Sequence, residues 1–390
     1  MLLQTPPLAL YVHMPWCVRK CPYCDFNSHV APEQLPQRDY IEALIQDLDY
    51  DLEIAAGRPL VSIFFGGGTP SLFSPSEISR FIESVRARFA CAGNFEVTLE
   101  ANPGTIEHGR FAEYRAAGIT RVSLGVQSFN DEHLKVLGRI HGSADVHRAV
   151  DELVAAGLDN FNLDLMYGLP QQSTAQALSD LESAIALQPA HLSHYQLTLE
   201  PGTVFYHRPP PLPDDDATWQ MQTDCQTLLD RHGYEQYEVS AYAREGRRCR
   251  HNVNYWAFGD YIGIGAGAHG KVTHSGKVER RVRCRQPRDY LGRTAKARIT
   301  EQREVAGEDL AFEFMLNALR LKEGFATQQF EAHTGLPLHT IAPLLERART
   351  RGLLEGDGSF LRPTELGNRF LNDLQMIFLP AGGRRLEGQP

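Results

Sequence analysis

The chain has 390 residues, of which 42% are hydrophobic and 22% are charged. This composition is ordinary for a globular protein, so it excludes a fibrous chain and wholesale disorder. The formal net charge of -9 at pH 7 argues against a general polyanion binder, and we predict no nucleic-acid partner. No apolar run reaches about 18 residues and the N-terminus lacks a signal-peptide pattern, so we expect a cytoplasmic protein with at most peripheral membrane contact.

Predicted strands alternate with predicted helices over roughly the first 200 residues. The strands are expected at 8–13, 61–65, 95–100, 121–126, 160–166 and 192–199. Apolar residues at helical spacing predict helices at 39–55, 76–89, 106–117, 132–137, 144–156 and 174–187. Such an alternation predicts an α/β fold with a parallel sheet, and periodicity alone fits a doubly wound sheet and a partial, open barrel equally well.

In the second half of the chain the sequence predicts separate helices, a loop and a hairpin in place of the regular strand–helix alternation. In chain order these are a proline-rich loop at 208–213, helices at 216–232, 310–321, 327–333 and 338–351, and a hairpin at 352–363. The last helices and the hairpin predict a small winged-helix-like α/β module. We therefore expect a core over 1–240, a glycine-rich segment over 241–303 that completes the core, and a C-terminal domain over 304–390.

A basic tract lies inside this acidic chain. Residues 244–303 hold 15 Lys and Arg against 5 Asp and Glu, a net charge of +10. Two interpretations stay open, which are a binding surface for a local anionic partner and a solvated charged face.

Three of the seven cysteines lie within eight residues, directly after the first predicted strand. Cys17, Cys21 and Cys24 are soft thiolate ligands at a spacing that suits an iron–sulfur cluster. A structural zinc site needs four ligands, and here His29 is the only close substitute for a fourth cysteine. An iron–sulfur cluster, a zinc site and redox cysteines all remain possible from spacing alone, with the cluster favoured because three cysteines leave one iron open to a ligand.

The context of these cysteines resembles a known superfamily. The segments Tyr11-Val-His-Met-Pro-Trp-Cys17 and Cys21-Pro-Tyr-Cys24 are similar to the cluster loop of radical S-adenosylmethionine proteins, and 66–70 (GGGTP) resembles their glycine motif. Glu100, Gln127, Arg139 and Asp164 follow in the order seen in the branch that includes oxygen-independent coproporphyrinogen III oxidase. The resemblance covers nearly the whole chain and implies a partial, open (β/α) barrel.

The resemblance also implies cofactors and their ligands. Cys17, Cys21 and Cys24 would hold a [4Fe–4S] cluster. S-adenosylmethionine would contact Tyr11, Gly67, Gly68, Thr69, Glu100, Gln127, Arg139 and Asp164. Taken singly, each residue has a structural interpretation as well, namely a tight turn for the glycines and an ion pair, cap or hydrogen bond for the polar groups.

Two features distinguish activities within this branch. The oxidase carries a further cysteine two residues after the third, where this chain has Phe26, which cannot ligate metal. The segment from His251 to Trp256 (HNVNYW) resembles the HNxxYW motif of HemW-type heme chaperones. That resemblance makes His251 a candidate heme ligand and Tyr255 and Trp256 candidate heme contacts.

Arginines around this motif would pair the heme propionates. They are Arg247, Arg248, Arg250, Arg280, Arg281, Arg283 and Arg285.

Two functions follow from the resemblance. The first is a heme chaperone that passes heme to apo-hemoproteins such as respiratory enzymes. The second is a radical S-adenosylmethionine oxidase of coproporphyrinogen III, which would need an electron donor. Phe26 and His251 favour the first, and whether the protein is an enzyme stays open.

Overall fold

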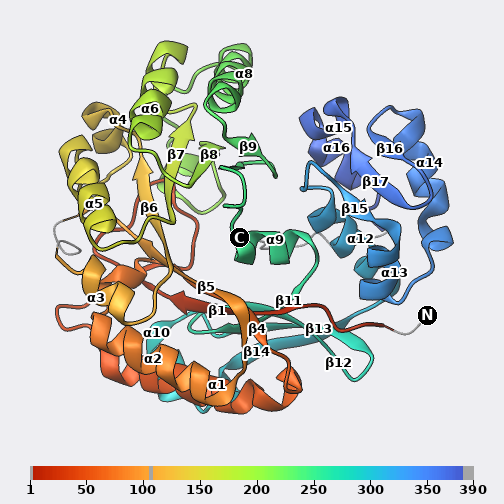
Figure 1. Cartoon of the computed structure of the whole chain (residues 1–390), viewed down its shortest axis with the longest axis horizontal. Helices are drawn as coiled ribbons and strands as arrows, with labels where there is room; N and C mark the ends of the chain where they lie inside the picture. Colours follow the sequence, from red (N-terminus) through yellow and green to blue (C-terminus); the bar gives the residue numbers. More distant parts are fainter. Residues whose placement is uncertain (1–2, 105–108, 381–390) are drawn as a thin grey trace.

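The computed structural model describes residues 3–104 and 109–380. A twelve-stranded sheet, in the order β14-β13-β12-β11-β1-β4-β5-β6-β7-β8-β10-β9, forms the body of the molecule (Figure 1). Its strands are β1 (Leu8–Met14), β4 (Leu60–Gly67), β5 (Cys91–Ala101), β6 (Arg121–Gln127), β7 (Phe161–Tyr167), β8 (His191–Gln196), β9 (Glu235–Gln236), β10 (Ala241–Ala243), β11 (Asp260–Ile264), β12 (His269–His274), β13 (Lys277–Arg283) and β14 (Ile299–Val305).

The centre of the sheet is parallel and both its ends are antiparallel. β11, β1 and β4 to β8 run in one direction, and β9, β10 and β12 to β14 pair antiparallel at the edges. No strand pairing joins β14 to β9 among the described residues. The predicted α/β fold with six parallel strand–helix units and an open barrel is therefore confirmed.

Helices cover the outer side of this curved sheet (Figure 1). They are α1 (Gln37–Ala55), α2 (Pro75–Arg88), α3 (Phe111–Ala116), α4 (Asp131–Val136), α5 (Ser143–Ala155), α6 (Thr174–Ala186) and α8 (Asp215–Arg231). Each buries an apolar stripe, as Ile41, Leu44 and Leu48 do on α1. The helix predicted at 106–117 begins later, at Phe111, and residues 105–108 lie outside the described part of the chain.

The segment that sequence periodicity left unassigned supplies half of the sheet. Residues 234–303 hold β9 to β13, most of β14, and the short helices α9 (Arg250–Trp256), α10 (Pro287–Gly292) and α11 (Ala295–Arg298). β11 pairs parallel with β1, so a strand from residue 260 onward lies beside the first strand of the chain. Periodicity missed these strands because β9 and β10 are short and β12 to β14 carry many polar residues.

A smaller unit with its own apolar core follows. It comprises α12 (Gly307–Ala318), β15 (Phe325–Ala326), α13 (Thr327–Thr334), α14 (Ala342–Thr350), β16 (Leu354–Gly356), β17 (Phe360–Pro363), α15 (Glu365–Arg369) and α16 (Leu371–Met376). β16 and β17 form the predicted hairpin. Figure 1 shows this unit, in blue, beside α9. None of the described helices is both long enough and apolar enough to cross a lipid bilayer.

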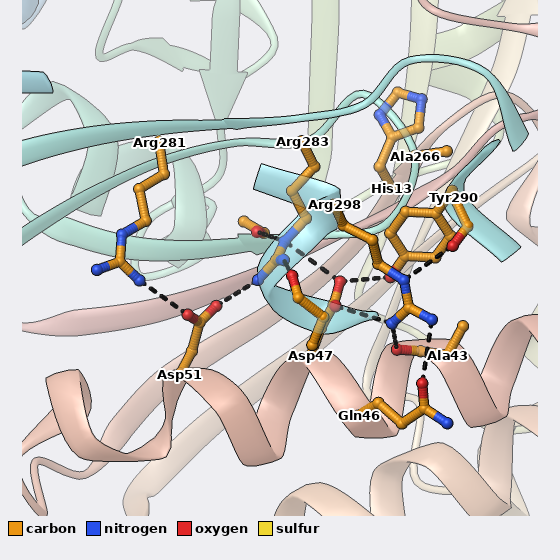
Figure 2. Close-up of polar contacts among 12 residues, drawn as sticks. His13, Ala43, Gln46, Asp47, Asp51, Ala266, Arg281, Arg283, Tyr290 and Arg298 are labelled. Atoms are coloured by element: carbon orange, nitrogen blue, oxygen red, sulfur yellow. Dashed lines mark hydrogen bonds and ion pairs between the residues drawn. The ribbon is translucent and has the colours of Figure 1, made fainter. Parts of the chain in front are cut away.

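Much of the basic tract is buried in ion pairs, as Figure 2 shows. Arg283 Nη2 lies 2.5 Å from Asp51 Oδ2, and Arg281 Nη1 lies 3.0 Å from the other oxygen of Asp51. Arg298 Nη1 lies 3.0 Å from Asp47 Oδ1, which comes from the same helix, α1. These guanidinium groups join the β13–α11 region to α1.

This network corrects the two interpretations for part of the tract. Arg280 pairs with Glu313, and Arg248 pairs with Glu235 and Glu323. Arg280, Arg281 and Arg283 therefore pair with buried carboxylates and are not available for heme propionates, whereas Arg248 and its two glutamate partners lie at the surface. A solvated face is equally wrong for Arg283 and Arg298, whose side chains are 2% exposed.

Candidate functional site

The cysteine loop lies at the carboxyl end of β1. Cys17 belongs to the short strand β2 (Trp16–Cys17), which pairs with β3 (His29–Val30), and Cys21 and Cys24 lie in the turn between them. All three thiols are partly exposed. Burial raises the pKa of Cys17, and that of Cys24 to about 11, with the neighbouring thiols adding to the effect. Three convergent soft donors at a partly open position fit an iron–sulfur cluster.

Arg139 connects this loop to the sheet. Its Nη1 lies 3.8 Å from Cys21 Sγ, and its Nη2 donates to the carbonyl oxygen of Gly125 at 2.7 Å and to Asn102 Oδ1. Asn102 Nδ2 in turn donates to Thr69 Oγ1 at 3.0 Å. The positive charge expected to meet a ligand carboxylate therefore lies directly beside the cysteines.

The glycine motif is packed against β1. Gly67 has φ +107°, and a Cβ there would lie 2.5 Å from the His13 ring. A Cβ on Gly68 would lie 2.6 Å from the carbonyl oxygen of Trp16. A side chain fits at neither position, so both glycines hold the end of β4 close to the strand that leads into the cysteine loop.

A hydrogen-bonded chain continues from this contact into the loop. Tyr11 Oη lies 2.7 Å from His13 Nδ1, and His13 Nε2 lies 2.9 Å from the carbonyl oxygen of Asn27. The carbonyl accepts, so Nε2 carries the hydrogen and Nδ1 accepts from Tyr11. Burial lowers the pKa of His13 to about 4, which keeps the ring neutral.

Two partly buried carboxyl groups project from β5 and β7. The register pairs Glu100 with Ser123 of β6, and Gly125 of β6 with Asp164 of β7. Glu100 Oε2 accepts from the Gly67 amide at 3.2 Å, and Asp164 accepts from Ser123 Oγ at 2.9 Å. Burial and the Asp164 charge raise the pKa of Glu100 to about 8, and burial raises that of Asp164.

Gln127 ends β6 in a left-handed conformation. Its φ is +71°, next to an irregularity in the β6–β7 pairing. Its Oε1 accepts from Tyr195 Oη at 2.7 Å, so the side chain points along the carboxyl edge of the sheet.

His251 lies inside the sheet's concave side on α9. Its ring stacks on Phe64 at 4.1 Å, and its Nδ1 lies 3.0 Å from Cys249 Sγ and 3.3 Å from Glu96 Oε1. Burial alone would lower the pKa of His251, but the Cys249 and Glu96 contacts outweigh it and raise the pKa to about 9. Burial disfavours the Glu96 carboxylate, yet His251 and Arg121 lower its pKa to about 2.

The other two residues of the motif face different surroundings. Tyr255 is half-buried and packs its edge on Tyr261, with ring centroids 4.7 Å apart. Arg320 of the C-terminal unit lies over the Trp256 ring at 4.1 Å. Trp256 Nε1 is buried and no hydrogen-bond partner for it occurs among the described residues.

A polar cavity of about 110 Å³ lies between α9 and the strands. It is lined by Phe64, Thr98, Glu100, Arg121, Ser123, Asn162, Asp164, His191, Ser193, Cys249, His251 and Asn252. A space of this size has room for several ordered waters.

The structure brings the predicted residues into two neighbouring groups. Thr69 and Arg139 surround the three cysteines, while Glu100, Asp164 and His251 line the cavity. Trp256 lies apart, against the C-terminal unit. Sequence reasoning missed Asn27, Asn102 and Glu96. Glu96 was detectable, because 96, 98 and 100 alternate onto one face of a strand.

Comparison with known proteins assigns the class. A profile of the "Radical SAM superfamily" matches residues 11–184, and one of the "HemN C-terminal domain" matches residues 305–370. The solved structure of coproporphyrinogen III oxidase (HemN) from Escherichia coli has a TM-score of 0.82 at 22% identity, and the match covers 96% of this chain and 90% of that one. The fold and the cysteine loop are therefore those of a radical S-adenosylmethionine protein.

Sequence relatives narrow the class to a family. The chain is 50% identical over 380 residues to "Heme chaperone HemW" of Escherichia coli, covering 97% of this chain and 100% of that protein. It is 35% identical over 386 residues to "Radical S-adenosyl methionine domain-containing protein 1, mitochondrial" of Mus musculus, covering 95% and 87%. The chain belongs to the HemW family.

Proposed function

We propose that this protein is a heme chaperone, which binds heme and passes it to apo-hemoproteins such as respiratory enzymes in the cytoplasm or at the membrane surface. The observation that carries the proposal is the 50% identity, over nearly the whole chain, to a relative named as a heme chaperone. Phe26 agrees with it, since this side chain is 48% exposed beside Cys24 and offers no ligand atom.

Cys17, Cys21 and Cys24 would hold a [4Fe–4S] cluster, and Tyr11, Gly67, Gly68, Thr69, Glu100, Gln127, Arg139 and Asp164 would line the S-adenosylmethionine site. The cluster, when bound, supplies an open iron and a reducing electron. Arg139 keeps a positive charge at Cys21, and neutral His13 holds the loop backbone through Asn27. These contacts orient the loop.

For heme, His251, Tyr255 and Trp256 are the candidate contacts. His251 is 6% exposed and bonded to Glu96 and Cys249, so heme ligation through it requires α9 to release these contacts. The Trp256 indole, whose Nε1 has no hydrogen-bond partner in the described part of the chain, lies at the end of the same helix. Displacement of α9 from the sheet would release His251 and Tyr255, whereas Trp256 would also have to leave Arg320 of the C-terminal unit.

A titration tests the proposal. Heme is added anaerobically to the cluster-loaded protein and to a His251→Ala variant, and the Soret band is followed. We expect saturable binding to the wild type and a weaker or spectrally changed complex in the variant. Absence of saturable binding to the wild type would overturn the chaperone.

The second candidate is oxidation of coproporphyrinogen III with an external electron donor. This second function is worth testing because the polar residues expected around the cysteine loop are all present. Incubation of reduced, cluster-loaded protein with S-adenosylmethionine and coproporphyrinogen III separates the two functions. A chaperone leaves the substrate unchanged, whereas formation of protoporphyrinogen IX would establish the oxidase.

A further inference from the structure

Three side chains with metal-ligand atoms converge at the N-terminus of α9. Glu96 comes from the interior face of β5, Cys249 precedes the first residue of α9, and His251 is the second residue of the helix. One oxygen, one sulfur and one nitrogen lie within 4.8 Å of one another, and all three residues are buried. None of them belongs to the cysteine loop.

The triangle formed by these oxygen, sulfur and nitrogen atoms has about the size of one face of a tetrahedral zinc site. The S–N, N–O and S–O separations are 3.0, 3.3 and 3.8 Å. Tetrahedral bonds to zinc of about 2.3 Å for sulfur and about 2.1 Å for nitrogen and oxygen place such ligands about 3.4–3.6 Å apart. The observed edges differ from these values by about 0.6 Å at most, and the S–N edge differs most.

The surroundings hold the ligands in place. Glu96 Oε1 also accepts from the backbone amide of Arg250 at 3.1 Å, which orients the carboxylate toward α9. The Phe64 ring stacks on His251 with an interplanar angle of 8° and fixes the plane of the imidazole. Three ligands are therefore positioned before any ion binds.

The cavity supplies the remaining coordination position. Cys249 and His251 both line the polar space of about 110 Å³, which is large enough for a water beside the triangle. A thiolate and a carboxylate carry two negative charges, which attract a divalent ion and of which the Arg121 guanidinium on the cavity wall offsets a part. Three protein ligands and one water are the ligand set of an open zinc site.

We propose that Glu96, Cys249 and His251 bind a zinc-type divalent ion, with a cavity water as fourth ligand. The site goes beyond the proposed heme function. A heme iron takes ligands only above and below its ring, so three atoms on one triangular face suit a bare ion. Heme and the ion would compete for His251.

Zinc analysis tests the site in the cluster-loaded full chain, in which iron occupies the cysteine loop. The protein is dialysed against Zn²⁺ and then against buffer, and bound zinc is measured by mass spectrometry. We expect about one zinc per chain in the wild type and its loss in Glu96→Gln, Cys249→Ser and His251→Ala. Glu96→Gln keeps a hydrogen-bond acceptor for the α9 amides, so it tests ligation in a folded chain.

Cys91→Ser is the matched control, because this half-buried thiol lies on the same strand as Glu96. Its zinc content should equal that of the wild type. Retention of zinc in all three ligand variants, or no zinc in the wild type, would overturn the site. Heme titration of the wild type and of Glu96→Gln, each with and without Zn²⁺, separates the two proposals. In a heme chaperone without a zinc site, neither the substitution nor Zn²⁺ changes the heme affinity or the Soret change on heme binding.

Discussion

Arg139 and Cys21 are in direct contact across the mouth of the sheet, with 3.8 Å between Nη1 and Sγ. The same guanidinium is anchored to the Gly125 carbonyl oxygen, so its position is set by β6 and not by the loop. A fixed positive charge beside a thiolate stabilises the reduced, more negative form of any cluster that the thiolate holds.

Removal of this charge should make the cluster harder to reduce. For Arg139→Met we expect a reduction potential lower by roughly 60 mV, which corresponds to a tenfold change in the equilibrium constant of a one-electron reduction. An anaerobic redox titration followed by electron paramagnetic resonance measures it. Arg148→Met is the control, because Arg148 is exposed on α5. Equal potentials in both variants would contradict the role of Arg139.

The three loop cysteines should each be necessary for the cluster. We expect Cys17→Ser, Cys21→Ser and Cys24→Ser to lose most of the iron and sulfide, from about four of each per chain in the reconstituted wild type. Colorimetric iron and sulfide analysis measures this. Cys225→Ala should keep the full content, since Cys225 is buried on α8. Full content in any loop variant would remove that cysteine from the ligand set.

The buried carboxylate of Asp47 should stabilise the fold strongly. In Asp47→Asn the guanidinium group of Arg298 loses its buried anionic partner and that of Arg283 keeps only Asp51, so we expect the free energy of unfolding to fall by about 3–5 kcal/mol. Urea denaturation of the cluster-free chain measures it.

The same helix provides the control for this prediction. Asp49 pairs with Arg88 at 2.6 Å, but its side chain is 56% exposed. Solvent screening limits such a pair to about 0.2–1 kcal/mol. Asp49→Asn should therefore have little effect, and equal losses in both variants would show that burial does not decide the contribution.

Glu100 should make the cluster-free chain less stable as pH rises. Its pKa is raised from 4.5 to about 8, so the folded state keeps a proton that the unfolded state releases. The resulting stability is complete below pH 4.5 and is lost as pH rises to about 8. Glu100→Gln should be more stable at pH 7 by on the order of 3 kcal/mol.

Urea denaturation at pH 5 and pH 7.5 measures this difference. Asp164 contributes a slope of the same sign, because burial raises its pKa too, so the variant should show a smaller slope and not a flat profile. Identical slopes in the wild type and the variant would show that Glu100 ionises freely in the folded chain.

The parallel half of the fold was predictable because strand–helix alternation is local. The strand predicted at 121–126 is β6, and the helix predicted at 174–187 is α6. The second half was not predictable in this way, since β11 is defined by its pairing with β1, about 250 residues earlier. Pairing between strands that are so far apart in the sequence produces no local repeat of apolar residues from which it could be predicted.

The candidate site follows the same division. The spacing of Cys17, Cys21 and Cys24 predicts that they are ligands, because one loop carries all three. The role of Arg283 could not be predicted, because its partners Asp47 and Asp51 lie more than 230 residues away in the sequence. Composition alone indicated a charge on a binding surface or on a solvated face. Spacing detects ligands within a loop, whereas pairing of distant charges requires the fold.

The anchoring of Asn27 has a consequence for the order of biosynthesis. Asn27 Nδ2 donates to the carbonyl oxygens of Ala266 and Arg285 at 2.9 Å, and Arg285 follows Asn27 by 258 residues. At roughly 5–20 residues per second, a ribosome needs tens of seconds to add these partners. A nascent chain therefore lacks these two anchors of the cysteine loop until residues 266 and 285 have been added.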